Sequence, residues 1–142
     1  NIDLMKKEEP ISKIMTKEVI TLNLSNTLYT AEKRLKKNNI RHIPVVNGKR
    51  LMGMISLSDI LRISFIDAYN EEGTVDTAIY NMMSIEDLMI KNLITVPSHT
   101  PIYEVAKLLA NKKFHSLPIV DDELLVGIVT TTDLLNYFVE NC

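Results

Sequence analysis

The chain has 142 residues, of which 46% are hydrophobic and 24% are charged, and its formal net charge is −2. This composition is ordinary for a folded globular protein and argues against wholesale disorder. Acidic and basic residues are interspersed, so no basic patch favours nucleic acid, and no apolar run approaches the roughly 18 residues that suggest a membrane span.

The chain contains an internal duplication. Residues 11–65 align with residues 85–139 without a gap, at a spacing of 74 residues and with fourteen identities among 55 positions. The duplication predicts an N-terminal tail, two repeats and a linker, with the boundaries 1–10, 11–65, 66–84 and 85–142.

Each repeat is predicted to contain a helical turn, an extended run, a helix, two strands and a last helix. In the first repeat these elements lie at 11–15, 19–22, a helix through Leu28, Ala31 and Leu35, strands at 43–46 and 51–56, and a helix from Asp59. In the second repeat they lie at 85–89, 93–96, a helix through Ile102, Val105 and Leu109, strands at 117–120 and 124–130, and a helix from Asp133.

Local signals support several of these boundaries. Thr100-Pro101 predicts an N-cap followed by proline at the first helical position, and the linker is expected to carry some helix around 76–82. A repeat of about 55 residues is marginal by itself. We therefore expect two βαββα repeats of the α+β class, packed with pseudo-two-fold symmetry into one compact body with a shared core.

Both repeats contain the pattern glycine, two apolar residues, a hydroxyl residue, two further residues and aspartate. It reads GMISLSD at 53–59 and GIVTTTD at 127–133. A hydroxyl three residues before an acid is typical of a helix capping box. The same groups suit a nucleotide, because a carboxylate accepts hydrogen bonds from ribose hydroxyls, and hydroxyls at a helix N-terminus bind phosphate. From these residues alone, both interpretations stay open.

The tandem spacing, the repeated motif and the apolar residue–proline steps in RHIPVV and HSLPIV resemble the cystathionine β-synthase (CBS) domain. The resemblance covers residues 11–139. Such domains occur in tandem pairs called Bateman modules. The resemblance implies a disc-like α/β unit, two clefts between the repeats that bind AMP, ADP, ATP or S-adenosylmethionine, and docking of two pairs into a homodimer.

The resemblance also implies the residues of each cleft, with aspartate on ribose, hydroxyl and basic residues on phosphate, and apolar residues around the base. The favoured cleft would comprise Thr130, Thr132, Asp133, Val19, Ile20, Ile40, Arg41, His42 and His115. The second cleft would comprise Ser56, Ser58, Asp59, Leu93, Ile94, Phe114 and Ser116. Core packing is the alternative that we favour for Met15, Met89, Ile20 and Ile94, and a solvated strand end is the alternative for the basic residues.

The sequence shows no Cys-x-x-Cys pair, Walker loop or G-x-G-x-x-G motif, so we expect no metal site and no enzymatic activity. A single cysteine and the absence of a secretory signal favour a cytoplasmic location. The leading hypothesis is a module that senses an adenine nucleotide and acts on an unidentified partner protein. The alternatives are a structural or dimerisation module with empty clefts, an S-adenosylmethionine sensor, and the regulatory fragment of a larger transporter or enzyme.

Overall fold

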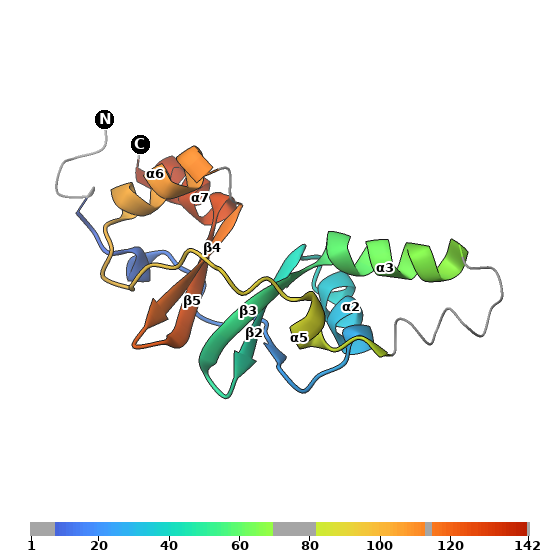
Figure 1. Ribbon diagram of the computed structural model, residues 1–142. Coiled ribbons are helices and arrows are strands. Elements are labelled where there is room, and N and C mark those ends of the chain that lie inside the picture. The colour runs from blue at the N-terminus through green and yellow to red at the C-terminus, as the bar shows by residue number, and fades with distance from the viewer. Residues whose placement is uncertain (1–7, 70–81, 113–114, 142) are drawn as a thin grey trace. The chain divides into compact units, whose positions relative to one another are not determined.

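The computed structural model describes residues 8–69, 82–112 and 115–141 (Figure 1). They form two compact units whose limits differ from those of the sequence repeats. Unit 1 combines the described residues up to Val19 with those from Ile94 onward, and unit 2 contains those between Ile20 and Leu93. The first residues of each repeat therefore belong to the unit that is formed mainly by the other repeat.

Unit 2 has a short sheet and helices from the first repeat, together with one helix from the start of the second. Its elements are β1 (Leu22–Asn23), α2 (Leu28–Lys37), β2 (His42–Asn47), β3 (Arg50–Ser56), α3 (Leu57–Tyr69) and α5 (Ile85–Leu88). Strand β2 pairs with β1 in parallel and with β3 in antiparallel orientation. The predicted face of α2 is confirmed, since Leu28, Ala31 and Leu35 are all buried.

Unit 1 is built from the corresponding parts of the other repeat. Its elements are the 3-10 helix η1 (Ile11–Lys13), α6 (Ile102–Lys112), β4 (Ser116–Asp121), β5 (Leu124–Thr130) and α7 (Thr131–Asn141). Strands β4 and β5 form an antiparallel hairpin with a bulge between Ile119 and Val120, and β2–β3 carries a bulge at the corresponding place. The repeated order of helices and strands thus gives the mixed α+β fold that we predicted.

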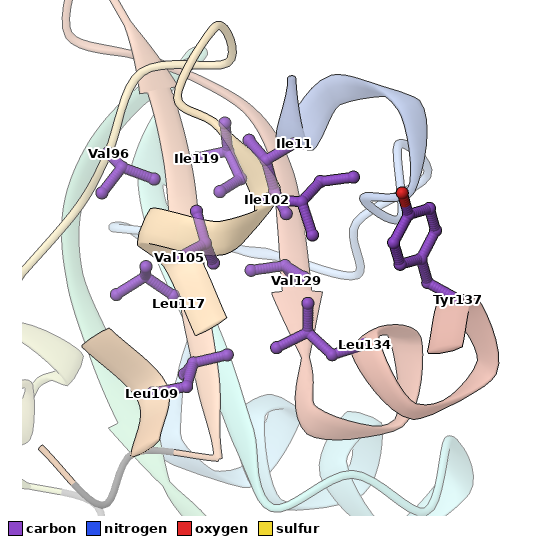
Figure 2. Close-up of a cluster of buried hydrophobic side chains, with 10 residues drawn as sticks. All are labelled: Ile11, Val96, Ile102, Val105, Leu109, Leu117, Ile119, Val129, Leu134 and Tyr137. Carbon is purple, nitrogen blue, oxygen red and sulfur yellow. The ribbon is translucent and has the colours of Figure 1, made fainter. Parts of the chain in front are cut away.

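Each unit has its own hydrophobic cluster, which differs from the single shared core that we expected. Figure 2 shows the cluster of unit 1, in which Ile11 of η1 lies among side chains of α6, β4, β5 and α7. In unit 2 the corresponding residue, Ile85, is also fully buried. A repeat of this size buries too little apolar surface alone, and the segment from the other repeat completes each cluster.

Each repeat thus contributes its first residues, 11–19 or 85–93, to the unit formed mainly by the other repeat, and we call these the exchanged segments. Backbone hydrogen bonds hold both segments in place. The N–H of Thr16 donates to the carbonyl oxygen of Ile128 in β5 at 2.8 Å, and the N–H of Ile128 donates to the carbonyl oxygen of Thr16 at 2.9 Å. Ile90 and Met54 of β3 do the same at 2.8 and 3.0 Å. Each pairing places a methionine, Met15 or Met89, directly over the glycine of the repeated motif.

Several predicted boundaries were wrong. The extended run at 19–22 yields only the two-residue strand β1, and the run at 93–96 yields a single bridge from Val96 to Ile119. Pro97, at the position of Asn23, lacks the N–H that would continue the ladder. Helix α6 begins at Ile102, one residue later than Thr100-Pro101 predicts, and α3 runs to Tyr69, four residues into the predicted linker. The helix predicted around 76–82 falls almost entirely outside the described residues.

Candidate functional site

The motif of the second repeat forms the junction between β5 and α7. The backbone N–H of Thr130 donates to Asp133 Oδ2 at 3.0 Å, and the N–H of Asp133 donates to Thr130 Oγ1 at 3.1 Å. This reciprocal pair is a capping box, which satisfies two N–H groups that have no partner within the helix. The capping interpretation of GIVTTTD is therefore confirmed.

Thr16 adds a hydroxyl to this junction. Its Oγ1 donates to Asp133 Oδ2 at 3.4 Å, and its backbone pairing with Ile128 holds it there. Sequence reasoning could not select Thr16, because Thr16 and Asp133 are 117 positions apart and the corresponding residue in the other repeat is Ile90. Within the part of the chain that the structure describes, no hydrogen bond to Asp133 Oδ1 and no basic partner of Asp133 is recorded.

His115 lies beside the same helix start. Its carbonyl oxygen accepts a hydrogen bond from the N–H of Thr131 at 3.0 Å and one from the hydroxyl of Thr131 at 3.4 Å. Both His115 and Thr132 are exposed. Unit 1 therefore gathers Thr130, Thr132, Asp133 and His115 at the N-terminus of α7, and we call these four residues with Thr16 the Asp133 site.

The motif of the first repeat forms a related junction in unit 2, which we call the Asp59 site. Ser56 is buried, and its Oγ accepts from the N–H of Asp59 at 3.1 Å and lies 3.2 Å from Ser58 Oγ. The Asp59 carboxylate does not complete a capping box; its Oδ1 pairs with Nη2 of Arg62, one turn later. The carbonyl of Arg41 accepts from the N–H of Leu57 at 2.8 Å, which puts Arg41 at this helix start.

The other predicted site residues divide between the units. Val19, Ile94 and Ser116 belong to unit 1, whereas Ile20, Ile40, His42 and Leu93 belong to unit 2. Ile40 packs against the cluster of unit 2. Phe114 lies outside the described residues. The structure thus brings together Thr130, Thr132, Asp133 and His115, and separately Ser56, Ser58, Asp59 and Arg41; the further grouping of these residues into two clefts stays a prediction.

The alternative of core packing is correct for the methionines only. Met89 is 8% exposed, and Met15 is half-buried against the cluster of unit 1. Ile20 and Ile94 are 37% and 40% exposed, so the prediction that they are core residues was wrong. Each of them lies four residues after the bridge residue of the exchanged segment before it, Thr16 or Ile90, and two residues before the next strand or bridge, and neither belongs to a hydrophobic cluster.

Among residues 8–69, 82–112 and 115–141, no three His, Cys, Asp or Glu side chains gather where they could hold a metal ion. No described helix has both the length and the apolar character required to cross a membrane.

The chain matches the model of the CBS domain twice, at residues 11–65 and 85–140. A CBS domain-containing protein of Dictyostelium discoideum is 33% identical over 136 residues, which cover 92% of this chain and 91% of that protein. Some relatives are enzymes, of which this chain matches only 23% or 24% of the length.

Two solved structures of similar fold contain adenosyl compounds. The structure of CBSX2 in complex with AMP is 25% identical, with a TM-score of 0.77 and coverage of 93% of this chain and 97% of that one. The CBS domain pair of protein MJ0100, in complex with 5′-methylthioadenosine and S-adenosyl-L-methionine, is 30% identical, with a TM-score of 0.69 and coverage of 91% and 98%. From the two family matches and the relatives that share nearly its whole length, we conclude that this chain belongs to the CBS domain family and consists of a tandem pair of CBS domains.

Proposed function

We propose that this CBS pair is a regulatory module that binds an adenine nucleotide, AMP, ADP or ATP, at the Asp133 site. The observation that carries the proposal is the Asp133 carboxylate, whose Oδ2 is fixed by hydrogen bonds from Thr130 and Thr16 while none of the described residues bonds to its Oδ1. A carboxylate held in one orientation is a strong acceptor for ribose hydroxyls, because hydrogen bonds to charged groups are stronger than hydrogen bonds between neutral groups. The AMP complex of CBSX2 supports this choice of ligand class.

The phosphate would lie at the start of α7. The exposed residues Thr132 and His115 lie at this end of an 11-residue helix, whose N-terminus carries a partial positive charge. Val19 belongs to the same unit, and in this proposal its side chain makes an apolar contact with the base. The remaining predicted residues, Ile20, Ile40, Arg41 and His42, belong to unit 2, and their part in binding stays a prediction.

Regulation requires the ligand to prefer one arrangement of the module over another, because equal affinity for both shifts no equilibrium. We propose that a partner protein reads this change, that the module itself is not an enzyme and that it acts in the cytoplasm as a homodimer. The dimer is supported by Leu135 and Val139, which lie one turn apart on α7 and are 58% and 78% exposed. Analytical ultracentrifugation of wild type and Leu135→Glu tests it, with a shift toward monomer expected in the variant.

S-adenosylmethionine is the second candidate, since the MJ0100 domain pair was solved with it and with 5′-methylthioadenosine. Both compounds share the ribose of AMP and lack its phosphate. The Asp133 carboxylate would suit all of them, whereas Thr132 and His115 favour the compounds that carry phosphate. The order of affinities therefore distinguishes the two candidates.

A thermal-shift panel with AMP, ADP, ATP, S-adenosylmethionine and 5′-methylthioadenosine, with GMP as the control for the base, tests the proposal. A ligand at a hundredfold excess over its Kd adds about 2.7 kcal/mol of apparent stability, so the midpoint rises clearly. We expect the largest rise with an adenine nucleotide and a reduced rise in Asp133→Ala. No rise with any compound would support a structural module with empty clefts.

A further inference from the structure

The Asp133 and Asp59 sites differ at two positions, each of which contacts the aspartate in one of the two sites. Arg62, three residues after Asp59, corresponds to Asn136 after Asp133 at the repeat spacing of 74 residues. Thr16, which donates to Asp133, corresponds to Ile90 in the other repeat. The two sites therefore have the same backbone plan and different charges around the carboxylate.

At the Asp59 site the carboxylate is already paired. Nη2 of Arg62 contacts Oδ1 of Asp59, and the side chain of Arg62 is 68% exposed whereas that of Asp59 is 22% exposed. An incoming ribose would have to share this oxygen with the guanidinium or displace it. Because the arginine compensates the charge of the carboxylate, the remaining lone pairs also become weaker acceptors.

At the Asp133 site no such competitor is recorded among the described residues. The donors to Asp133 are the neutral N–H of Thr130 and the neutral hydroxyl of Thr16, and both use Oδ2. Asn136 is exposed and carries no charge. Among the described residues, Oδ1 of Asp133 therefore has no guanidinium beside it, unlike Oδ1 of Asp59.

We infer that Arg62 ranks the two sites, so that the first nucleotide binds at Asp133 and the Asp59 site is the weaker one because Arg62 competes for its carboxylate. The inference rests on the proposed function and assigns Arg62 as a specificity-determining residue that acts without touching the preferred ligand. An exposed ion pair is worth little, so the expected competition is about twofold to fivefold in Kd.

Isothermal titration with AMP tests the ranking through a reciprocal exchange of the two residues. Arg62→Asn should tighten the weaker binding event about twofold to fivefold, measured both in the full chain and in an Asp133→Ala background where the first event is removed. Asn136→Arg should weaken the tighter event by a similar factor, because it places a guanidinium beside Asp133. Asn136→Ala is the matched control without charge, and circular dichroism checks that each variant is folded.

The outcomes separate the inference from the proposed function. If Arg62→Asn weakens the binding of AMP, the ranking is wrong and Arg62 is a phosphate ligand. If wild type binds two molecules of AMP with equal affinity, the ranking is wrong and Arg62 is a bystander. In both cases the proposal of nucleotide binding stands. If Asp133→Ala proves unstable, Asp133→Asn takes its place as the background, since its amide oxygen still accepts from Thr130. If folded wild type binds no AMP at all, the proposed function fails, and the ranking fails with it.

Discussion

Thr130 and Asp133 form two reciprocal hydrogen bonds at the start of α7, each from the backbone N–H of one residue to the side-chain oxygen of the other, with N–O distances of 3.0 and 3.1 Å. The two hydrogen bonds use Oγ1 of the threonine and Oδ2 of the aspartate. Oδ1 takes no part in them, so the helix cap and a ligand can occupy the same carboxylate. The cap also fixes the orientation of that carboxylate before any ligand arrives, which reduces the entropy lost on binding.

The first prediction separates the cap from the ligand site. Asp133→Ala should lower the free energy of unfolding by about 1 kcal/mol through loss of the cap, and should weaken AMP binding by about 1–3 kcal/mol through loss of a charged acceptor. Asp133→Asn should keep most of the stability, because its amide oxygen can accept from Thr130, and should still bind AMP more weakly. Urea denaturation and isothermal titration measure the two effects. Equal affinities in wild type and Asp133→Ala would exclude Asp133 from the site.

The second prediction concerns the two glycines beneath the methionines. A Cβ at Gly127 would lie 2.5 Å from Met15 Sδ, and its three nearest atoms all belong to that flexible side chain. A Cβ at Gly53 would lie 2.7 Å from Met89 Sδ and 2.8 Å from the carbonyl oxygen of Ile90. Since a backbone carbonyl in a β-bridge cannot turn aside, Gly53→Ala should cost more stability than Gly127→Ala, within the range of about 1–3 kcal/mol for overpacking.

Thermal and urea unfolding of the two alanine variants give the comparison. Met89→Ala combined with Gly53→Ala is the informative control, because it removes the methionine and leaves the carbonyl contact. The double variant should recover only part of the loss caused by the new Cβ. Equal costs at the two glycines would show that the carbonyl of Ile90 can move.

The third prediction follows from the exchange of segments between the repeats. Ile11 is fully buried in the cluster of unit 1 and Ile85 in that of unit 2. Replacing a buried isoleucine by alanine costs about 2–5 kcal/mol. Ile11→Ala should therefore speed amide hydrogen exchange mainly in β4 and β5, and Ile85→Ala mainly in β2 and β3, although each residue lies in the other sequence repeat.

Hydrogen exchange followed by mass spectrometry of peptic fragments measures this pattern. The two variants serve as each other's control, because the substitution is the same and the positions correspond. If Ile11→Ala affected the β2–β3 hairpin more than the β4–β5 hairpin, the assignment of η1 to unit 1 would be wrong.

The fourth prediction is a pH dependence at the strand end of unit 1. The hydroxyl of Ser98 donates to Asp121 Oδ2 at 2.6 Å and its N–H to Oδ1 at 2.9 Å. These hydrogen bonds, led by that of the hydroxyl, lower the pKa of Asp121 below its usual value. Because the pKa is lower in the folded than in the unfolded chain, the stabilisation is complete above the unfolded pKa and is lost as the pH falls through the folded pKa.

Ser98→Ala should therefore be less stable than wild type at neutral pH, and the difference should shrink in acid. The N–H of residue 98 still donates in the variant, so part of the lowering of the Asp121 pKa remains. Urea unfolding at pH 7 and at a series of pH values below 4 measures the difference, and Asp121→Asn provides a reference without a titrating carboxyl. A constant difference between wild type and Ser98→Ala at all pH values would contradict this origin.

The local elements of this protein could be predicted from its sequence. The face of α2 through Leu28, Ala31 and Leu35, the two hairpins and the cap at Thr130 and Asp133 all depend on neighbours within a few residues. The strand boundaries near β1 could not be predicted as well, because a two-residue strand or a single bridge depends on its partner and not on its own pattern.

The duplication, the order of helices and strands, and the positions of the two motifs can be predicted without the structure, since each of these follows from spacing and periodicity along the chain. The three-dimensional fold was needed to find that Ile11 and Ile85 complete the clusters of the opposite repeats and that Thr16 donates to Asp133. The fold was also needed to find that Asp59 pairs with Arg62 and does not complete a capping box. The first two of these contacts join residues far apart in the chain, and the third is a choice among several partners within reach, so none of them leaves a periodic signal in the sequence.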